Sequence, residues 1–247
     1  SCFYDKNSKL KTSPVWKKME FINYKNDISF YNVKPLKIKN KQFYPLASVW
    51  SGTNSGNKPK KETILVCDRG ENNLKKPEKF VKIWSNVDFE PKLEIDPETV
   101  LPDVFTIWRP VAPEGYVSMG DYVSKGIQKP KLDSVRCIKK NLVESYDVSD
   151  TNVWNEYGFN INLKKTEKSK SKVCKLKPVS IFPIGITNKE EEIKNLGHKK
   201  IDNIKNGGYN LFRTSDTASR KPLEETRKSG YVIKPSAYNV VKTDDPD

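Results

Sequence analysis

The chain has 247 residues, of which 35% are hydrophobic and 11% are aromatic, and its single His is at position 198. This length fits one domain or two small ones, the composition fits a folded core, and no run of 18 apolar residues is present to span a bilayer. Lys and Arg total 45 against 31 Asp and Glu, a formal net charge of +14, and a single His excludes metal sites built from several histidines.

The positive charge comes mainly from lysine, since six of the 45 basic residues are Arg. The abundance of Lys together with 21 Asn indicates an AT-biased genome, such as that of an apicomplexan parasite. Codon bias is therefore one explanation of the charge. A basic face for anionic lipid or nucleic acid is the other.

The four cysteines, Cys2, Cys67, Cys137 and Cys174, permit three pairings and form no CxxC motif. Cys67 and Cys137 lie inside apolar, strand-like runs, which predicts buried free thiols. Whether the cysteines form disulfides stays open.

Three tryptophans mark similar segments along the chain. Trp16, Trp84 and Trp154 are separated by 68 and 70 residues, and each is followed five positions later by a Phe. A second pattern of apolar residues ends in a basic-Pro pair, at Lys34-Pro35, Arg109-Pro110 and Lys177-Pro178. A third apolar run ends in a small residue, at Ala47, Gly120 and Gly185.

This order predicts a single β domain, 1–247, made of three units of about 70 residues: 11–78, 79–148 and 149–240. Short β-branched and aromatic runs between Pro, Gly, Asn and Asp predict strands throughout. We expect an all-β, β-prism-like closure about a pseudo-threefold axis, rather than a β-trefoil, with Trp16, Trp84 and Trp154 in the core. A capping box at Thr187 and Glu190 predicts one helical insertion in the third unit, over 188–205.

Residues 105–144 contain the most characteristic sequence motif of the chain, a string of Trp, Pro and Gly positions in fixed succession. It consists of Trp108, Arg109, Pro110, Gly115, Tyr116, Gly120 and Asp121. The string resembles the vacuolar protein sorting-associated protein 62 family, and FYNVKP, FYPLASVW, ETILVCD and LKKPEKFVKIWSN follow that family's order over about residues 16–160. It is also similar to the adaptor-binding repeats of vacuolar protein sorting-associated protein 13.

The resemblance implies an all-β module of endosomal and vacuolar trafficking, intracellular and peripheral to membranes, with a secretory location left open. The physical chemistry of the string leaves two roles for it. Gly115 allows a turn, Gly120 a close approach, and Asp121 can accept backbone N–H bonds, so the string can be a structural corner. Alternatively, its seven residues line a binding groove in which Trp108 is the anchor.

A Lys-rich loop is predicted at 164–172, with the sequence KKTEKSKSK. Its lysines are Lys164, Lys165, Lys168, Lys170 and Lys172. A polybasic loop of this kind favours an anionic membrane surface, with a solvated insertion as the alternative.

The chemistry of known catalytic motifs is absent from the sequence, which contains no GxGxxG, Walker loop, HExxH or GxSxG string. We therefore expect no enzyme, no cofactor and no bound metal. The function indicated is a non-enzymatic binding module in membrane trafficking that contacts a protein partner or larger assembly, or an anionic phospholipid surface. Two alternatives are a lectin-like or pore-forming-protein accessory domain and a Lys-rich nucleic-acid-binding protein. The repeated positions are apolar rather than polar, and the Lys loop lacks Arg and aromatics, which disfavours both.

Overall fold

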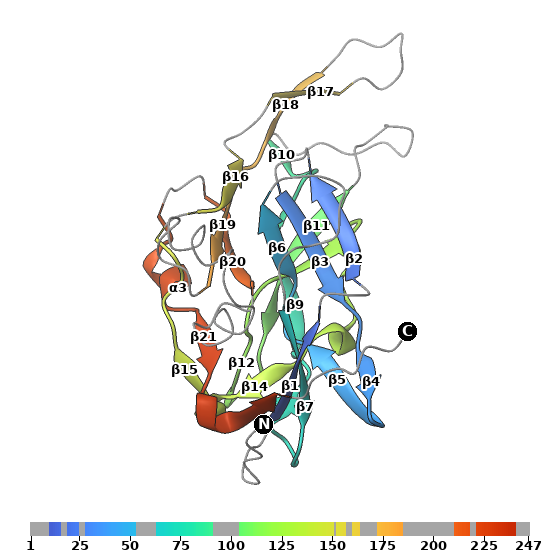
Figure 1. The fold of residues 1–247 in the computed structure, drawn as a ribbon. Helices are drawn as coiled ribbons and strands as arrows, with labels where there is room; N and C mark the ends of the chain where they lie inside the picture. The colour runs from blue at the N-terminus through green and yellow to red at the C-terminus, as the bar shows by residue number, and fades with distance from the viewer. Residues whose placement is uncertain are drawn as a thin grey trace.

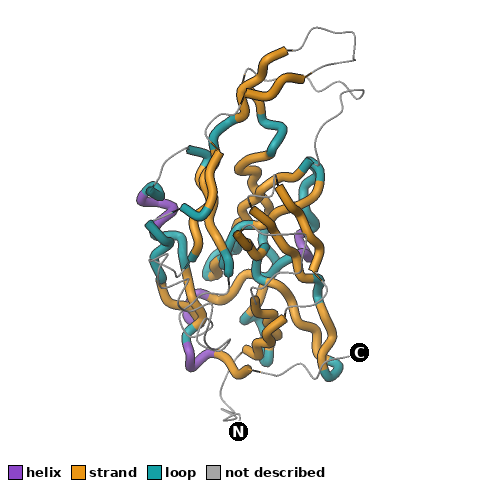
Figure 2. Tube along the Cα trace, turned by 45° about the horizontal axis from the view of Figure 1, so that its top comes forward, coloured by secondary structure: helices purple, strands orange, loops and turns teal. Residues whose placement is uncertain are grey.

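The computed structural model describes residues 10–15, 19–24, 28–52, 63–90, 104–150, 152–156, 160–163, 172–184, 210–217 and 221–240. Strands make up nearly all of the regular structure in these ranges (Figures 1 and 2). The all-β fold predicted from the sequence is therefore confirmed. The α-helix of the described residues is α3 (Glu224–Arg227), in the third predicted unit. The helix predicted over 188–205 lies outside them.

Each predicted unit contributes one three-stranded antiparallel sheet among the described strands. The first joins β2 (Met19–Tyr24), β3 (Ile28–Val33) and β6 (Val49–Gly52). The second joins β9 (Lys79–Ser85), β11 (Phe105–Val111) and β13 (Tyr122–Lys125). The third joins β16 (Trp154–Glu156), β19 (Val179–Pro183) and β20 (Phe212–Ser215). The threefold repeat and the prism-like closure themselves stay predictions.

The other strands pair outside these three sheets. A five-stranded sheet has the order β22 (Tyr238–Val240), β1 (Leu10–Val15), β7 (Thr63–Asp68), β5 (Lys41–Pro45) and β4 (Leu36–Ile38). Smaller sheets join β12 (Tyr116–Val117), β14 (Cys137–Lys139) and β8 (Leu74–Lys75), and β15 (Val143–Ser145) with β21 (Tyr231–Ile233). At the top of Figure 1, β10 (Phe89–Glu90), β18 (Lys172–Leu176) and β17 (Asn160–Leu163) form a further sheet.

The short 3-10 helices of the described chain are η1 (Leu132–Ser134), η2 (Lys140–Leu142) and η3 (Pro235–Ala237). Strand β1 pairs in parallel with β22, so the first and the last described strands share one sheet near the bottom of Figure 1.

Aromatic side chains from the three unit sheets meet in one core. The ring centroid of Phe30 lies 5.8 Å from that of Phe105 and 5.3 Å from that of Phe212. Trp84 lies 5.7 Å from Phe105 and 5.9 Å from Trp154, both as edge contacts. Trp84 and Trp154 are buried, as predicted, whereas Trp16 lies outside the described residues.

The register corrects our matching of the three units. Ile107 pairs with Trp84 on one side and Val123 on the other, and Ile181 pairs in the same way with Trp154 and Thr214. Residues 181–183 therefore belong to the central strand of the third unit. The third strand of that unit is β20 and not the run ending at Gly185, because that run begins in β19 and β20 is the strand that pairs with β19 opposite β16. Between Ile184 and Leu211 lie 26 residues.

The first unit is shifted as well, because Phe30 on the central strand pairs with Ile22 and Trp50. Ile22 therefore holds the register position of Trp84, a position that the sequence pattern gave to Trp16. The Trp spacing predicts one equivalent Trp in each unit. Spacing alone does not show whether a Trp lies on the strand that pairs with the central strand or in the segment before it.

We expect Trp84→Ala to lower the free energy of unfolding by about 3–5 kcal/mol, because Trp84 is 1% exposed and its Nε1 donates to the Lys177 carbonyl at 2.8 Å. Trp154→Ala should be similar in direction. Val81→Ala on the same strand as Trp84 is the control, since Val81 is 42% exposed and its loss should change stability by about 0.5 kcal/mol or less. Urea unfolding followed by circular dichroism measures both, and equal effects would contradict the core assignment.

Candidate functional site

The last residue of the string, Asp121, places a buried carboxylate at the junction of two sheets. Asp121 is 0% exposed, and its Oδ1 accepts hydrogen bonds from Arg109 Nε and Arg213 NH1, both at 3.1 Å. Its Oδ2 accepts from Arg109 NH2 at 3.1 Å and from the Thr214 backbone N–H at 2.7 Å. Arg109 comes from β11 and Arg213 from β20, so the cluster joins the second and third unit sheets. We call these three residues the Arg-Asp-Arg cluster.

The two arginines of the cluster also donate to neighbouring backbone carbonyls and to one serine hydroxyl. Arg109 NH2 also donates to the Thr214 carbonyl at 2.7 Å. Arg213 NH2 donates to the Ser118 carbonyl at 2.7 Å and its Oγ at 3.1 Å, and to the Ser229 carbonyl at 3.2 Å. The Arg213 side chain is 4% exposed, whereas that of Arg109 is 33% exposed. Arg213 is therefore a buried residue that links three segments of the chain by hydrogen bonds, whereas Arg109 is partly exposed at the surface.

The pKa of Asp121 lies below its usual range. Burial alone would raise it, but the charges of Arg109 and Arg213 and the hydrogen bonds from Arg109 and Thr214 outweigh that effect. The charge of Asp121 in turn raises the pKa of Arg109. Both groups are therefore ionised at neutral pH. With four donors on its two oxygens, Asp121 is placed to hold strands together rather than to take a proton from a substrate.

Backbone contacts around Asp121 join all three units. Ser48 N–H donates to the Asp121 carbonyl and Asp121 N–H donates to the Phe212 carbonyl, each at 3.0 Å. A Cβ on Gly120 would lie 2.9 Å from Ala47 Cβ and 3.2 Å from Leu211 Cβ. The Gly that the sequence singled out is thus required by close packing between units.

A second polar pair lies beside this junction in the first unit. Ser48 Oγ donates to Asn32 Oδ1, Asn32 Nδ2 donates to the Val123 carbonyl at 2.6 Å, and Val123 N–H donates to Ser48 Oγ at 2.8 Å. Asn32 and Ser48 therefore tie the first unit to β13 of the second.

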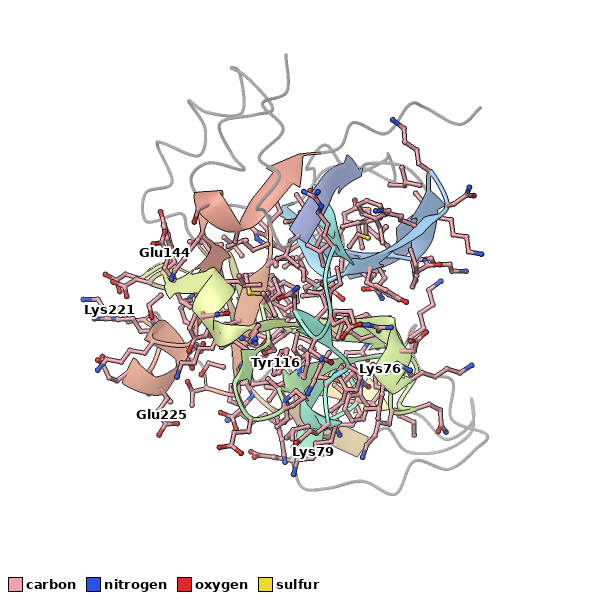
Figure 3. All side chains as sticks on the ribbon, turned by 90° about the horizontal axis from the view of Figure 1, so that it is seen from below. Lys76, Lys79, Tyr116, Glu144, Lys221 and Glu225 are labelled. Carbon is pink, nitrogen blue, oxygen red and sulfur yellow. The ribbon has the colours of Figure 1, made fainter. Side chains whose placement is uncertain are left out.

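The rest of the predicted corner is partly structural and partly exposed. Trp108 is buried against Phe80 and Val135, and its Nε1 donates to Ser124 Oγ at 2.8 Å. Pro110 is also buried, while Gly115 is exposed in a turn with φ 79°. Tyr116 is half-buried, donates its hydroxyl to the Asn72 carbonyl, and has Lys75 Nζ 4.9 Å from its ring centroid. Figure 3 shows Tyr116 near the middle of the lower face.

The seven corner residues are therefore brought together along one stretch, but Trp108, Pro110, Gly120 and Asp121 are buried. The structural role that we weighed for the string accounts for these four. A binding role for the exposed remainder stays a prediction. Lys164, Lys165, Lys168 and Lys170 lie outside the described residues, and Lys172 opens β18 without a described side chain.

Sequence reasoning missed Arg213, which completes the cluster. Its string Leu211-Phe212-Arg213-Thr214 is a short apolar run with one Arg, and Arg is scarce in this chain. That scarcity was the available signal, because an Arg within an apolar strand pattern needs a buried partner. In the described ranges, no three His, Cys, Asp or Glu side chains gather as metal ligands, and no helix there is long and apolar enough to cross a bilayer.

Comparisons with known proteins extend these observations. The family model described as "Vacuolar protein sorting-associated protein 62" matches residues 7–206. The crystal structure of GNIP1Aa from Chromobacterium piscinae superposes with a TM-score of 0.57 at 14% sequence identity, over 92% of this chain and 38% of that chain. This likeness shows a shared fold, and the chain spans well under half the length of GNIP1Aa. No curated protein matches the chain. The likeness to vacuolar protein sorting-associated protein 13 and the apicomplexan source stay predictions.

We expect Asp121→Asn to lower the free energy of unfolding by about 3–5 kcal/mol, because it leaves the buried Arg213 without its counter-charge. Glu224→Gln is the control, since the side chains of Glu224 and its partner Lys228 are 65% and 72% exposed and such pairs contribute about 0–1 kcal/mol. Urea unfolding at neutral pH compares the two, and equal losses would contradict a special role for Asp121.

The same variant should alter the pH dependence of stability. Because folding depresses the pKa of Asp121, its contribution is complete above the unfolded value of about 3.9 and is lost as pH falls through the folded pKa. The difference between wild type and Asp121→Asn should therefore be constant from about pH 7 to 5 and shrink below about pH 4. A difference that already shrinks between pH 7 and 5 would mean that the folded pKa is raised instead.

The predicted buried free thiols are confirmed for Cys67 and Cys137. Burial raises the pKa of Cys137 to about 12, against the opposing charges of Arg213 and Arg136. About one thiol in 10,000 would then be ionised at pH 8, and the thiolate is the reactive form. We expect thiol reagents to modify Cys137 only after unfolding, as read by peptide mass spectrometry. Modification of Cys137 in the native protein would contradict its burial beside the Arg-Asp-Arg cluster.

Proposed function

The chain belongs to the vacuolar protein sorting-associated protein 62 family, and from this membership we propose that it is a non-enzymatic binding module of membrane trafficking. It holds an anionic membrane surface or a protein partner. The family gives a role related to vacuolar sorting. The binding mode is our inference from which side chains remain available on the surface.

The observation that carries the proposal is the closure of the Arg-Asp-Arg cluster. Both oxygens of Asp121 are occupied by donors from Arg109, Arg213 and Thr214. The charged side chains of the motif, Arg109 and Asp121, are therefore hydrogen-bonded within the fold, where they hold strands together. Lysines on strands and turns, most of them exposed in the described ranges, are among the charged groups that remain accessible. Such groups attract anionic surfaces more readily than they perform chemistry.

A protein partner is the second candidate, and one observation favours it. Arg109 pairs in register with Val81, which is 42% exposed, and the Arg109 side chain itself is 33% exposed. An exposed apolar side chain next to a partly exposed Arg is a composition typical of interface centres. Tyr116, half-buried beside Lys75, lies on the same unit.

Sedimentation with vesicles tests the membrane mode. We expect binding to phosphatidylcholine vesicles that contain phosphatidylserine, little binding to phosphatidylcholine alone, and release at high salt, because salt screens the attraction. Changing Lys164, Lys165, Lys168, Lys170 and Lys172 to Gln should weaken binding without changing the unfolding midpoint if the Lys loop takes part.

The outcomes separate the two binding modes. Failure of the wild-type chain to sediment with anionic vesicles at low salt would contradict the membrane mode. Cross-linking of a partner that Val81→Asp abolishes, with unchanged unfolding, would then support the protein-partner mode. Failure of both experiments would contradict the proposed function.

A further inference from the structure

One hairpin of the first unit gathers positive charge without any acidic neighbour in sequence. Lys34, Lys37, Lys39 and Lys41 are all exposed along the hairpin formed by β4 and β5, residues 34–45. No Asp or Glu occurs between Asp27 and Glu62. We call residues 34–41, which contain these four lysines, the basic hairpin.

The tip of the basic hairpin is a tight turn. Lys39 and Asn40 have φ of 49° and 63°, which is the conformation of a two-residue type I′ turn. The flanking strands pair Leu36 with Phe43, Lys37 with Gln42 and Ile38 with Lys41. Strand β5 pairs with β7 only at Tyr44 and Pro45. Most of the hairpin therefore extends past β7 as a two-stranded ribbon at the edge of the five-stranded sheet, at the lower right of Figure 1.

Buried apolar side chains fix the backbone of the hairpin, and thereby the positions from which its lysines project. Phe43 is 1% exposed in a cluster with Val33, Leu65 and Cys67, and Leu36 and Ile38 pack against that cluster. The Arg136 guanidinium lies 3.6 Å from the centroid of the Tyr44 ring. The apolar side chains thus anchor the hairpin, and the lysines project from an ordered support.

Protection of a sheet edge explains only part of this pattern. Strand β4 is the edge of its sheet, and lysines on edge strands prevent pairing with other chains. That account covers Lys37 on β4. It does not cover Lys39, which lies in the turn where no strand edge exists, or Lys34, which precedes the strand.

The chemistry of the hairpin favours a phospholipid surface over nucleic acid. All four cations are lysines, whose compact charge suits a diffuse anionic layer, whereas base recognition favours Arg and exposed aromatic rings. Phe43 is buried, and Tyr44 is covered by Arg136. Viewed from below, Glu144, Lys221 and Glu225 lie on the opposite side of the molecule from the β4–β5 hairpin (Figure 3), which itself contains no acidic residue.

We propose that the basic hairpin, residues 34–41, is the surface through which this protein contacts anionic phospholipid headgroups. The inference rests on the proposed function and specifies which of its lysines make the contact. Each lysine close to an anionic leaflet contributes a factor of about five in partitioning, since about 1 kcal/mol per residue corresponds to that ratio.

The test compares two variants with the same change in charge. The hairpin variant carries Lys34→Gln, Lys37→Gln, Lys39→Asn and Lys41→Gln, with Asn at position 39 because Asn tolerates positive φ. The control carries Lys125→Gln, Lys129→Gln, Lys140→Gln and Lys177→Gln, four exposed positions outside the hairpin. Vesicles of phosphatidylcholine and phosphatidylserine are used at low salt.

We expect partitioning of the hairpin variant to fall at least about 25-fold, the effect of two contacting lysines, while the control loses much less. Equal losses would mean that net charge alone acts, and an unchanged hairpin variant would mean that another surface makes the contact. Either result overturns this inference while leaving the proposed membrane mode intact. No sedimentation of the wild-type chain would contradict both.

Two further measurements keep the inference testable if the fourfold variant fails to fold. Lys37→Glu with Lys41→Glu reverses the charge at two of the four lysines and brings the net charge of the hairpin to zero with only two substitutions, so binding should fall as far as in the fourfold variant. In the unmodified protein, anionic vesicles should protect Lys34, Lys37, Lys39 and Lys41 from acylation more than Lys125 and Lys129, as read by mass spectrometry. Equal protection at both sets, or protection by single-stranded RNA or polyglutamate but not by vesicles, overturns the phospholipid assignment.

Discussion

The buried carboxylate of Asp121 is the constraint on which the junction of the unit sheets depends. A charge without solvent is tolerated only where opposite charges and hydrogen-bond donors surround it, and here they come from β11 and β20. Arg213 in turn must reach the carbonyls of Ser118 and Ser229. Strand β20, the chain around Ser118 and the turn after α3 can therefore adopt few relative positions. The geometry of one side chain thereby fixes segments that are about 100 residues apart in sequence.

The three sheets meet through different chemistry at positions that correspond in register. Extending the pairing beyond Phe30, Ile107 and Ile181 by two residues gives Asn32 with Ser48, Arg109 with Asp121, and Pro183 with Phe212. The first is a neutral polar pair, the second an ion pair and the third apolar. Unlike pairs discriminate against an exchange of neighbouring strands, because a misplaced sheet would leave Asp121 without its cations. We infer that this chemical asymmetry specifies the arrangement of three otherwise similar sheets.

Much of the fold could be predicted from local patterns, since strand runs, buried Trp84 and Trp154, and the tight environment of Gly120 all have local sequence signals. The match between units could not. The Trp spacings of 68 and 70 residues placed Trp16 where the register has Ile22, and a segment of 26 residues separates the central and third strands of the third unit. Arg213 lies beyond that segment, and although an Arg in an apolar strand pattern indicates a buried partner, nothing local identifies that partner as Asp121. The free thiols were predictable because apolar strands bury whatever small side chain they contain.

The string that connects this chain to its family is largely internal, and this separates fold from function. Trp108, Pro110, Gly120 and Asp121 are buried, so substitutions there act on the junction of sheets before they act on any ligand. By contrast, the sequence between the two matched segments FYNVKP and FYPLASVW contains Lys37, Lys39 and Lys41. These lysines lie on a hairpin whose apolar side chains pack into a buried cluster. A tight turn can change its exposed side chains at little cost to the core, because only its φ angles and its apolar base are constrained. Surfaces of this kind are where members built on the same framework can differ in what they bind.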